Sequence, residues 1–162
     1  MSMSISLRVD LAEQQLTLRG DGRDVVYPVS TAVNGSGEQA DSGCTPRGWH
    51  RIRAKIGADA PSGTVFIGRR PTGEIYSAEL AAEHPRRDWI LSRILWLCGE
   101  EPGRNRGGRV DSMRRYIYIH GTPDTEPMRV PASHGCIRMR NADVIALFDR
   151  VPAGTRVEIV DA

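Results

Sequence analysis

The later part of the sequence contains one thiol with two imidazoles near it along the chain: Cys136, His134 and His120. A free thiol is only a few per cent thiolate at neutral pH, so a nucleophilic cysteine needs a nearby base. An imidazole can take the thiol proton and hold the thiolate as an ion pair. We therefore expect Cys136 to be a nucleophile activated by one of the two histidines.

His120 is the histidine that we expect to act as the base. His134 lies two residues before Cys136, and in an extended segment this spacing places both side chains on one side without making them face each other. His120 lies on a separate predicted strand, so tertiary packing can bring it opposite the thiol. No carboxylate adjoins it, so we expect a backbone carbonyl to orient its ring, with Gly121 the nearest candidate.

The glycine before the thiol, Gly135, indicates where an oxyanion would form. Because glycine has no Cβ, a substrate carbonyl can approach the backbone closely there. The N–H groups around Gly135 and Cys136 are candidate donors to that oxyanion, and one such donor is typically worth about 3–4 kcal/mol.

Two motifs carry a resemblance to a known family. His120-Gly121-Thr122, followed by Ser133-His134-Gly135-Cys136-Ile137-Arg138-Met139, resembles the signature of the L,D-transpeptidase catalytic domain family, which is YkuD-like. The resemblance covers nearly the whole chain and implies a β-sandwich-like fold. It implies that Cys136 is the nucleophile, that His120 is the base, and that the Gly121 backbone orients the base.

The same resemblance implies an acyl site and substrate contacts around the thiol. His134, Gly135 and the Cys136 amide would line the acyl site, and Arg138 would meet a substrate carboxylate. Ser133 is a further candidate substrate contact. Tyr118, which shares a strand face with His120, either packs in the core or contacts the substrate.

The implied substrate is a muropeptide. Family members attack the bond between meso-diaminopimelate and the terminal D-alanine of a murein tetrapeptide, form a thioester, and pass the acyl group to an amine or to water. The reaction needs no cofactor, and we expect no metal.

The N-terminal residues indicate where the chain would act. They have no basic region followed by an apolar region, so we expect no export signal, no membrane anchor and a cytoplasmic protein. Recycled muropeptides would meet it there, and water would be the acceptor, which makes it an L,D-carboxypeptidase. The alternative is a periplasmic L,D-transpeptidase that forms cross-links, if a signal has been removed.

Three other functions are weaker alternatives. A murein-binding module without chemistry would not need a thiol beside two histidines. A zinc site is the second alternative, but the spacing of its candidate ligands matches no common zinc module. These ligands would be His120, His134 and Cys136, with Asp124 or Glu126. A net charge of +2 is too small to indicate nucleic-acid binding.

Arginine is concentrated in one part of the chain. Of the 22 basic residues only Lys55 is a lysine, and residues 84–115 hold eight arginines against four acidic residues. Guanidinium groups suit carboxylates because of their fork geometry. This segment either faces an acidic substrate or is simply solvated.

The elements that must position these groups are mostly strands. The 162 residues fit one domain, residues 1–162, and the three cysteines at wide spacing indicate free thiols. Apolar spacing of three and four predicts helices at 88–97, capped by Asp88, and at 141–150. We therefore predict a β-dominated α+β fold with two main helices. Alternating patterns and short apolar runs predict strands at 5–9, 16–18, 25–30, 52–56, 64–67, 74–76, 116–120 and 155–160.

Overall fold

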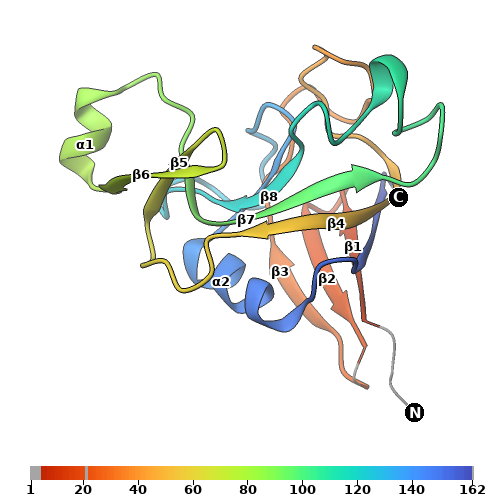
Figure 1. The fold of residues 1–162 in the computed structure, drawn as a ribbon, viewed down its shortest axis with the longest axis horizontal. Coiled ribbons are helices and arrows are strands. Elements are labelled where there is room, and N and C mark those ends of the chain that lie inside the picture. The colour runs from red at the N-terminus through yellow and green to blue at the C-terminus, as the bar shows by residue number, and fades with distance from the viewer. Residues whose placement is uncertain (1–4, 21, 162) are drawn as a thin grey trace.

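One mixed sheet of ten strands dominates the computed structural model, which describes residues 5–20 and 22–161. The strand order is β3-β2-β1-β10-β4-β7-β5-β6, and β8 pairs with both β7 and β9. The sheet curls, so that β1–β3 and β5–β6 run in different directions in Figure 1. The strands are β1 (Ser6–Asp10), β2 (Gln15–Arg19), β3 (Val25–Pro28), β4 (Gly48–Ile56), β5 (Thr64–Ile67), β6 (Arg70–Ile75), β7 (Ile90–Gly99), β8 (Tyr118–Gly121), β9 (Ile137–Met139) and β10 (Arg156–Val160).

The described residues form two α-helices, α1 (Ala78–Glu83) and α2 (Asn141–Arg150), and a short 3-10 helix at Gly108–Val110. The prediction of a β-dominated fold with two helices is confirmed. Of the two helices predicted, the one at 141–150 is present with the predicted bounds. None of the described helices has the length and apolar character needed to cross a membrane.

The main core lies between one face of the sheet and α2, which packs against β7 and β8 (Figure 1). Alternate residues of the strands point into it, as the period of two requires. Ile119 of β8 and Ile137 of β9 are fully buried there, together with Leu147 of α2. The opposite face of β8 is therefore left for other side chains, and the candidate site lies on it.

The helix predicted at 88–97 is wrong, because this segment is the central strand β7. Leu95 faces the main core, whereas Ile94 and Trp96 pack on the opposite face of the strand. A β-bulge between Leu91 and Ile94, where Ser92 has a φ of 72°, interrupts the alternation. A bulged strand with apolar residues on both faces imitates the spacing of a helix.

The helix α1 was missed, although its start has a recognisable signal. Ser77 is the N-cap, and its hydroxyl accepts a hydrogen bond from the N–H of Leu80 at 3.1 Å. The helix buries no residue and lies beyond the β5–β6 hairpin in Figure 1. Because α1 has no buried apolar face, its sequence lacks the apolar spacing of three and four residues from which a helix is predicted.

The central position of β7 predicts where the fold is most sensitive. Leu95→Ala should lower the free energy of unfolding by about 2–5 kcal/mol, because it empties a fully buried site. Val26→Ala on the edge strand β3, where the side chain is 49% exposed, should cost less than about 1 kcal/mol. Urea denaturation measures both values, and an equal loss would contradict the central place of β7 in the core.

Candidate active site

The site is built on two neighbouring parallel strands, β8 and β9. Their register pairs Ile119 with Ile137 and His120 with Arg138. Because Ile119 and Ile137 point into the main core, His120 and Arg138 point to the opposite face. Cys136, which directly precedes β9, packs on that face against the cluster that contains Tyr118. Cys136 and His120 are therefore diagonal neighbours across the two strands, and among the described residues each of the two side chains has its hydrogen bonds with backbone groups.

The thiol of Cys136 is held by backbone groups. The N–H of Tyr118 donates to Sγ at 3.3 Å, and the thiol donates to the carbonyl of Tyr116 at 3.4 Å. Gly135 has a φ of 131°, in a region that L side chains rarely adopt, so this turn requires glycine directly before the thiol. These contacts fix the direction in which the sulfur points.

His120 is fully buried, and its ring is oriented by the backbone. Nδ1 lies 2.7 Å from the carbonyl oxygen of Gly121. A carbonyl only accepts, so Nδ1 carries the proton and Nε2 is the nitrogen that can accept one. Among the described residues, Nε2 has no hydrogen-bond partner.

Burial opposes charge on both groups. It raises the pKa of Cys136 to about 12, against the lowering effects of the Tyr118 N–H, Arg138 and Arg115. It lowers the pKa of His120, against the hydrogen bond to Gly121, which raises it. A high thiol pKa and a low imidazole pKa both favour the neutral pair. The two pKa shifts favour a neutral thiol and a neutral imidazole over the ion pair expected from the sequence, which carried no information on the burial of His120 or on the partly buried position of Cys136.

Gly121 lies where no side chain fits. A Cβ on this residue would come within 2.5 Å of the carbonyl oxygen of Leu91 and 2.7 Å of Oδ1 of Asn141. Asn141, the first residue of α2, also donates from Nδ2 to the carbonyl of Thr122 at 3.0 Å. Gly121, whose carbonyl orients His120, is thus packed closely between β7 and the start of α2.

Arg138 carries a buried positive charge next to this pair. Nη2 donates to Oδ1 of Asp88 at 3.0 Å, and the Arg138 side chain is only 10% exposed. Its Nε is buried and has no hydrogen-bond partner among the described residues. Asp88, predicted to cap a helix, instead lies between α1 and β7 and faces the site. Because residues 88–97 were predicted to be a helix, the sequence did not indicate that Asp88 lies beside the site.

His134 lies at the rim of the site. Its side chain is 75% exposed, and Nδ1 lies 3.9 Å from Oδ2 of Asp88. It faces Asp88 and solvent, whereas His120 is enclosed by the sheet. In the part of the chain that the structure describes, no three His, Cys, Asp or Glu side chains are grouped to hold a metal ion.

Two candidate substrate contacts are occupied by other interactions. Ser133 is 1% exposed, accepts from the N–H of Gly135 at 3.2 Å and donates to the carbonyl of Cys136 at 2.6 Å. Tyr118 is 4% exposed, and its hydroxyl accepts from Arg69 at 3.0 Å. Ser133 therefore stabilises the turn before β9 by hydrogen bonds, and the Tyr118 side chain packs in the core. Sequence spacing carries no information on this burial.

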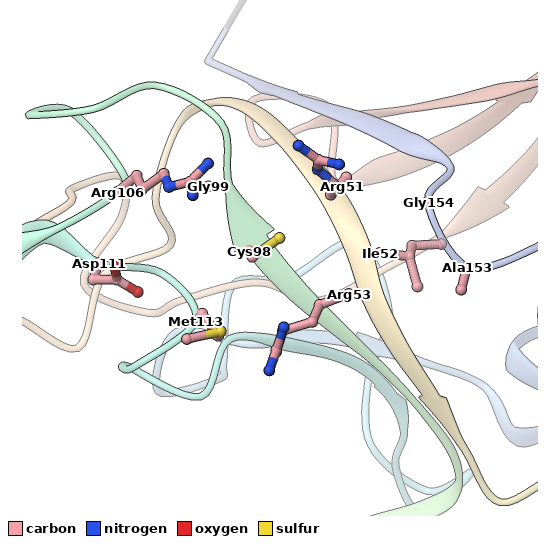
Figure 2. A pocket seen from close by; sticks show the side chains of 10 residues that line it. All are labelled: Arg51, Ile52, Arg53, Cys98, Gly99, Arg106, Asp111, Met113, Ala153 and Gly154. Carbon is pink, nitrogen blue, oxygen red and sulfur yellow. The ribbon is translucent and has the colours of Figure 1, made fainter.

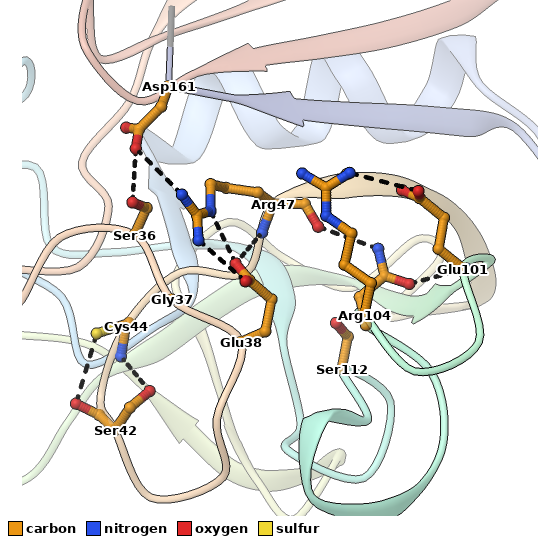
Figure 3. Close-up of polar contacts among 12 residues, drawn as sticks. Ser36, Gly37, Glu38, Ser42, Cys44, Arg47, Glu101, Arg104, Ser112 and Asp161 are labelled. Atoms are coloured by element: carbon orange, nitrogen blue, oxygen red, sulfur yellow. Dashed lines mark hydrogen bonds and ion pairs between the residues drawn. The ribbon is translucent and has the colours of Figure 1, made fainter.

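The loop before β4 supports the turn from outside. Thr45 donates from Oγ1 to the carbonyl of Gly135 at 2.9 Å, and Arg115 donates to the carbonyl of Cys44 at 2.6 Å. The loop is itself fixed by Glu38, which binds Arg47 through both carboxylate oxygens at 2.9 and 3.0 Å (Figure 3). Arg115 was not singled out from the sequence, although the concentration of arginine in residues 84–115 was a signal for it.

Family membership follows from comparison with known proteins. The sequence model of the family described as the L,D-transpeptidase catalytic domain matches residues 4–159. The chain belongs to this family. The resemblance predicted from the two motifs is confirmed.

Curated relatives are longer than this chain. The probable L,D-transpeptidase YbiS of Escherichia coli (strain K12) is 47% identical over 110 residues, which cover 66% of this chain and 35% of that protein. The probable L,D-transpeptidase ErfK/SrfK of Salmonella typhimurium is 27% identical over 155 residues, which cover 94% of this chain and 43% of that protein. The chain thus spans less than half the length of either relative.

Solved structures confirm the fold. An L,D-transpeptidase from Mycobacterium smegmatis has a TM-score of 0.59 at 18% identity, covering 98% of this chain and 59% of that chain. An L,D-transpeptidase in complex with imipenem has a TM-score of 0.57 at 17% identity, with the same coverage of both chains.

The raised pKa of Cys136 predicts how the resting thiol reacts. In a variant with Cys44→Ser and Cys98→Ser, alkylation by iodoacetamide should speed up about tenfold per pH unit between about pH 7 and 9, because the thiolate fraction rises in that proportion below the pKa. Mass spectrometry measures the rate. A rate that is constant across this range would indicate a preformed ion pair and contradict the prediction.

The wedged position of Gly121 predicts a loss of function without loss of a polar group. Gly121→Ala should displace this residue from Leu91 and turn the His120 ring, slowing acylation of Cys136 by an activated acyl donor about 10- to 100-fold. Intact-mass spectrometry follows the adduct. Val9→Ala, buried in the distant strand β1, is the control for lost stability, and an equal slowing in both variants would refute the positioning role.

Proposed function

We propose that the chain is a cysteine acyl-transfer enzyme that cleaves the bond between meso-diaminopimelate and D-alanine in peptidoglycan stem peptides and passes the acyl group to an amine. The observation that carries the proposal is the arrangement of Cys136 and His120 on one face of β8 and β9. The imidazole proton lies on Nδ1 and is bound to the Gly121 carbonyl, so Nε2 is available as a base. A module that only binds murein would need none of this arrangement.

The first half of the reaction forms a thioester. His120 Nε2 takes the proton from Cys136 as the sulfur attacks the carbonyl carbon of the scissile bond, forming a C–S bond and an oxyanion. The intermediate collapses and the C–N bond breaks. The imidazolium gives its proton to the leaving amine, so D-alanine departs neutral at nitrogen and the imidazole is restored.

The N–H of Cys136 is the donor that we assign to the oxyanion. It has no acceptor among the described residues, whereas the N–H of Gly135 already binds Ser133. Of the two candidate donors named from the sequence, we therefore assign the role to the N–H of Cys136. Arg138, with its unpartnered buried Nε, would bind a substrate carboxylate, and Asp88 would position Arg138.

The second half of the reaction returns the thiol. An acceptor amine loses a proton to His120 Nε2 as it attacks the thioester carbonyl, the C–S bond breaks, and the sulfur takes the proton back. Water could follow the same route. The names of the curated relatives support transfer to an amine, so we propose transpeptidation in preference to the L,D-carboxypeptidase activity expected from the sequence.

Digestion of a tetrapeptide muropeptide tests the proposal. We expect free D-alanine and cross-linked dimers by mass spectrometry, no turnover for Cys136→Ala, and a rate reduced at least about 100-fold for His120→Ala, which removes the general base. His84→Ala, a histidine change outside the site, should keep wild-type activity. Tripeptide without dimers would mean that water is the acceptor, and turnover by Cys136→Ala would refute the covalent mechanism.

A further inference from the structure

A cavity of about 630 Å³, whose lining does not include Cys136, has three arginines among its ten lining residues (Figure 2). Arg51 and Arg53 reach it from β4, and Cys98 from β7. The loop between β7 and β8 contributes Arg106, Asp111 and Met113, and the turn before β10 contributes Ala153 and Gly154. No residue that we assign to the reaction lines it.

The charge of this cavity is not neutralised by its own residues. Asp111 is the single acidic residue of the lining, and its two oxygens accept from the N–H groups of Gly107 at 2.7 Å and Arg114 at 2.9 Å. Among the described residues, neither Arg53 nor Arg106 forms an ion pair. Arg51 has only a long contact with Glu100, at 3.8 Å. Three guanidinium groups therefore face one cavity with little compensation.

Direct contacts connect the cavity with the reacting groups. Arg53 stacks with its Cζ 5.7 Å from the ring centre of Trp96, which belongs to the same packed cluster as Cys136. The carbonyl of Met113, a lining residue, accepts from Nε1 of Trp96 at 3.1 Å and from the N–H of Tyr116 at 3.0 Å. The carbonyl of Tyr116 in turn accepts from the Cys136 thiol. The cavity is thus linked to the thiol through the backbone groups of Met113 and Tyr116.

We propose that this arginine cavity binds the free carboxylates of a peptidoglycan stem peptide, as a second contact remote from the scissile bond. The proposal rests on the proposed function, since it concerns the same substrate. Guanidinium forks bind carboxylates through paired hydrogen bonds, and the apolar surface of Met113 and Ala153 suits a peptide better than a bare ion. Of the two possibilities for the arginine-rich segment, contact with an acidic substrate then applies to Arg106.

Binding to the inactive Cys136→Ala protein tests the proposal without turnover. Calorimetry should give a dissociation constant for the murein tripeptide that rises about tenfold in Arg53→Gln and again in Arg106→Gln, each variant losing one charged contact. Amidation of the peptide carboxylates should raise the dissociation constant of the protein that keeps all three arginines. The amidated peptide should then bind the arginine variants and this protein with the same dissociation constant. Arg109→Gln removes an arginine from the same loop but outside the cavity, and should leave binding unchanged.

Three results would overturn the proposal. One is equal affinity of the arginine variants and Arg109→Gln for the peptide. Another is that the unsubstituted cavity binds the amidated peptide as tightly as the peptide with free carboxylates. The third is inorganic phosphate binding as tightly as the peptide and through the same arginines, which would make the cavity a phosphate site. Acylation of Cys136 in the unsubstituted protein by a carbapenem tests the proposed function separately: absence of an adduct would refute the proposed function, whereas the binding results above are obtained without turnover and concern the cavity alone.

Discussion

The chemistry of this protein depends on the register of two short parallel strands. This register pairs His120 with Arg138, so the imidazole, the guanidinium and the thiol of Cys136 lie on one face of the two strands. On the other face, Ile119 and Ile137 pack into the core. A shift by one residue would exchange the two faces and bury the reactive groups under α2. The close approach of Gly121 to β7 and the contacts of Asn141 hold that register.

Burial favours the neutral form of both groups. Desolvation raises the pKa of the Cys136 thiol and lowers the pKa of the His120 imidazole. The charged groups that surround them, Arg138, Arg115 and Asp88, are fixed by hydrogen bonds before any substrate arrives. Such preorganised groups lose little energy in reorganisation during the reaction.

The arginine-rich segment 84–115 divides into groups with different surroundings. Arg93 is buried and stacks on Phe148, Arg115 holds the loop at Cys44, and Arg106 faces the cavity beside β4. Arginine side chains of this one segment thus pack in the core, donate hydrogen bonds to the backbone, or are candidates for binding an anion. Composition identified the segment, but only the sheet could separate these uses, because strands β4 and β7 come together from residues far apart in the chain.

The sequence alone determined the family, most strands and the helix at 141–150, and it predicted the reactive groups, because these are expressed in local spacing: Ser-His-Gly-Cys, His-Gly and alternating apolar residues. It misassigned β7, since a bulge at Ser92 and apolar residues on both faces imitate a helix. It also did not indicate that Asp88 and Arg115 lie beside the site, or that Ser133 is buried and hydrogen-bonded within the turn. These depend on burial and on contacts between distant segments, and only tertiary packing decides which side chains are buried, which pKa values shift, and which arginines remain unpaired.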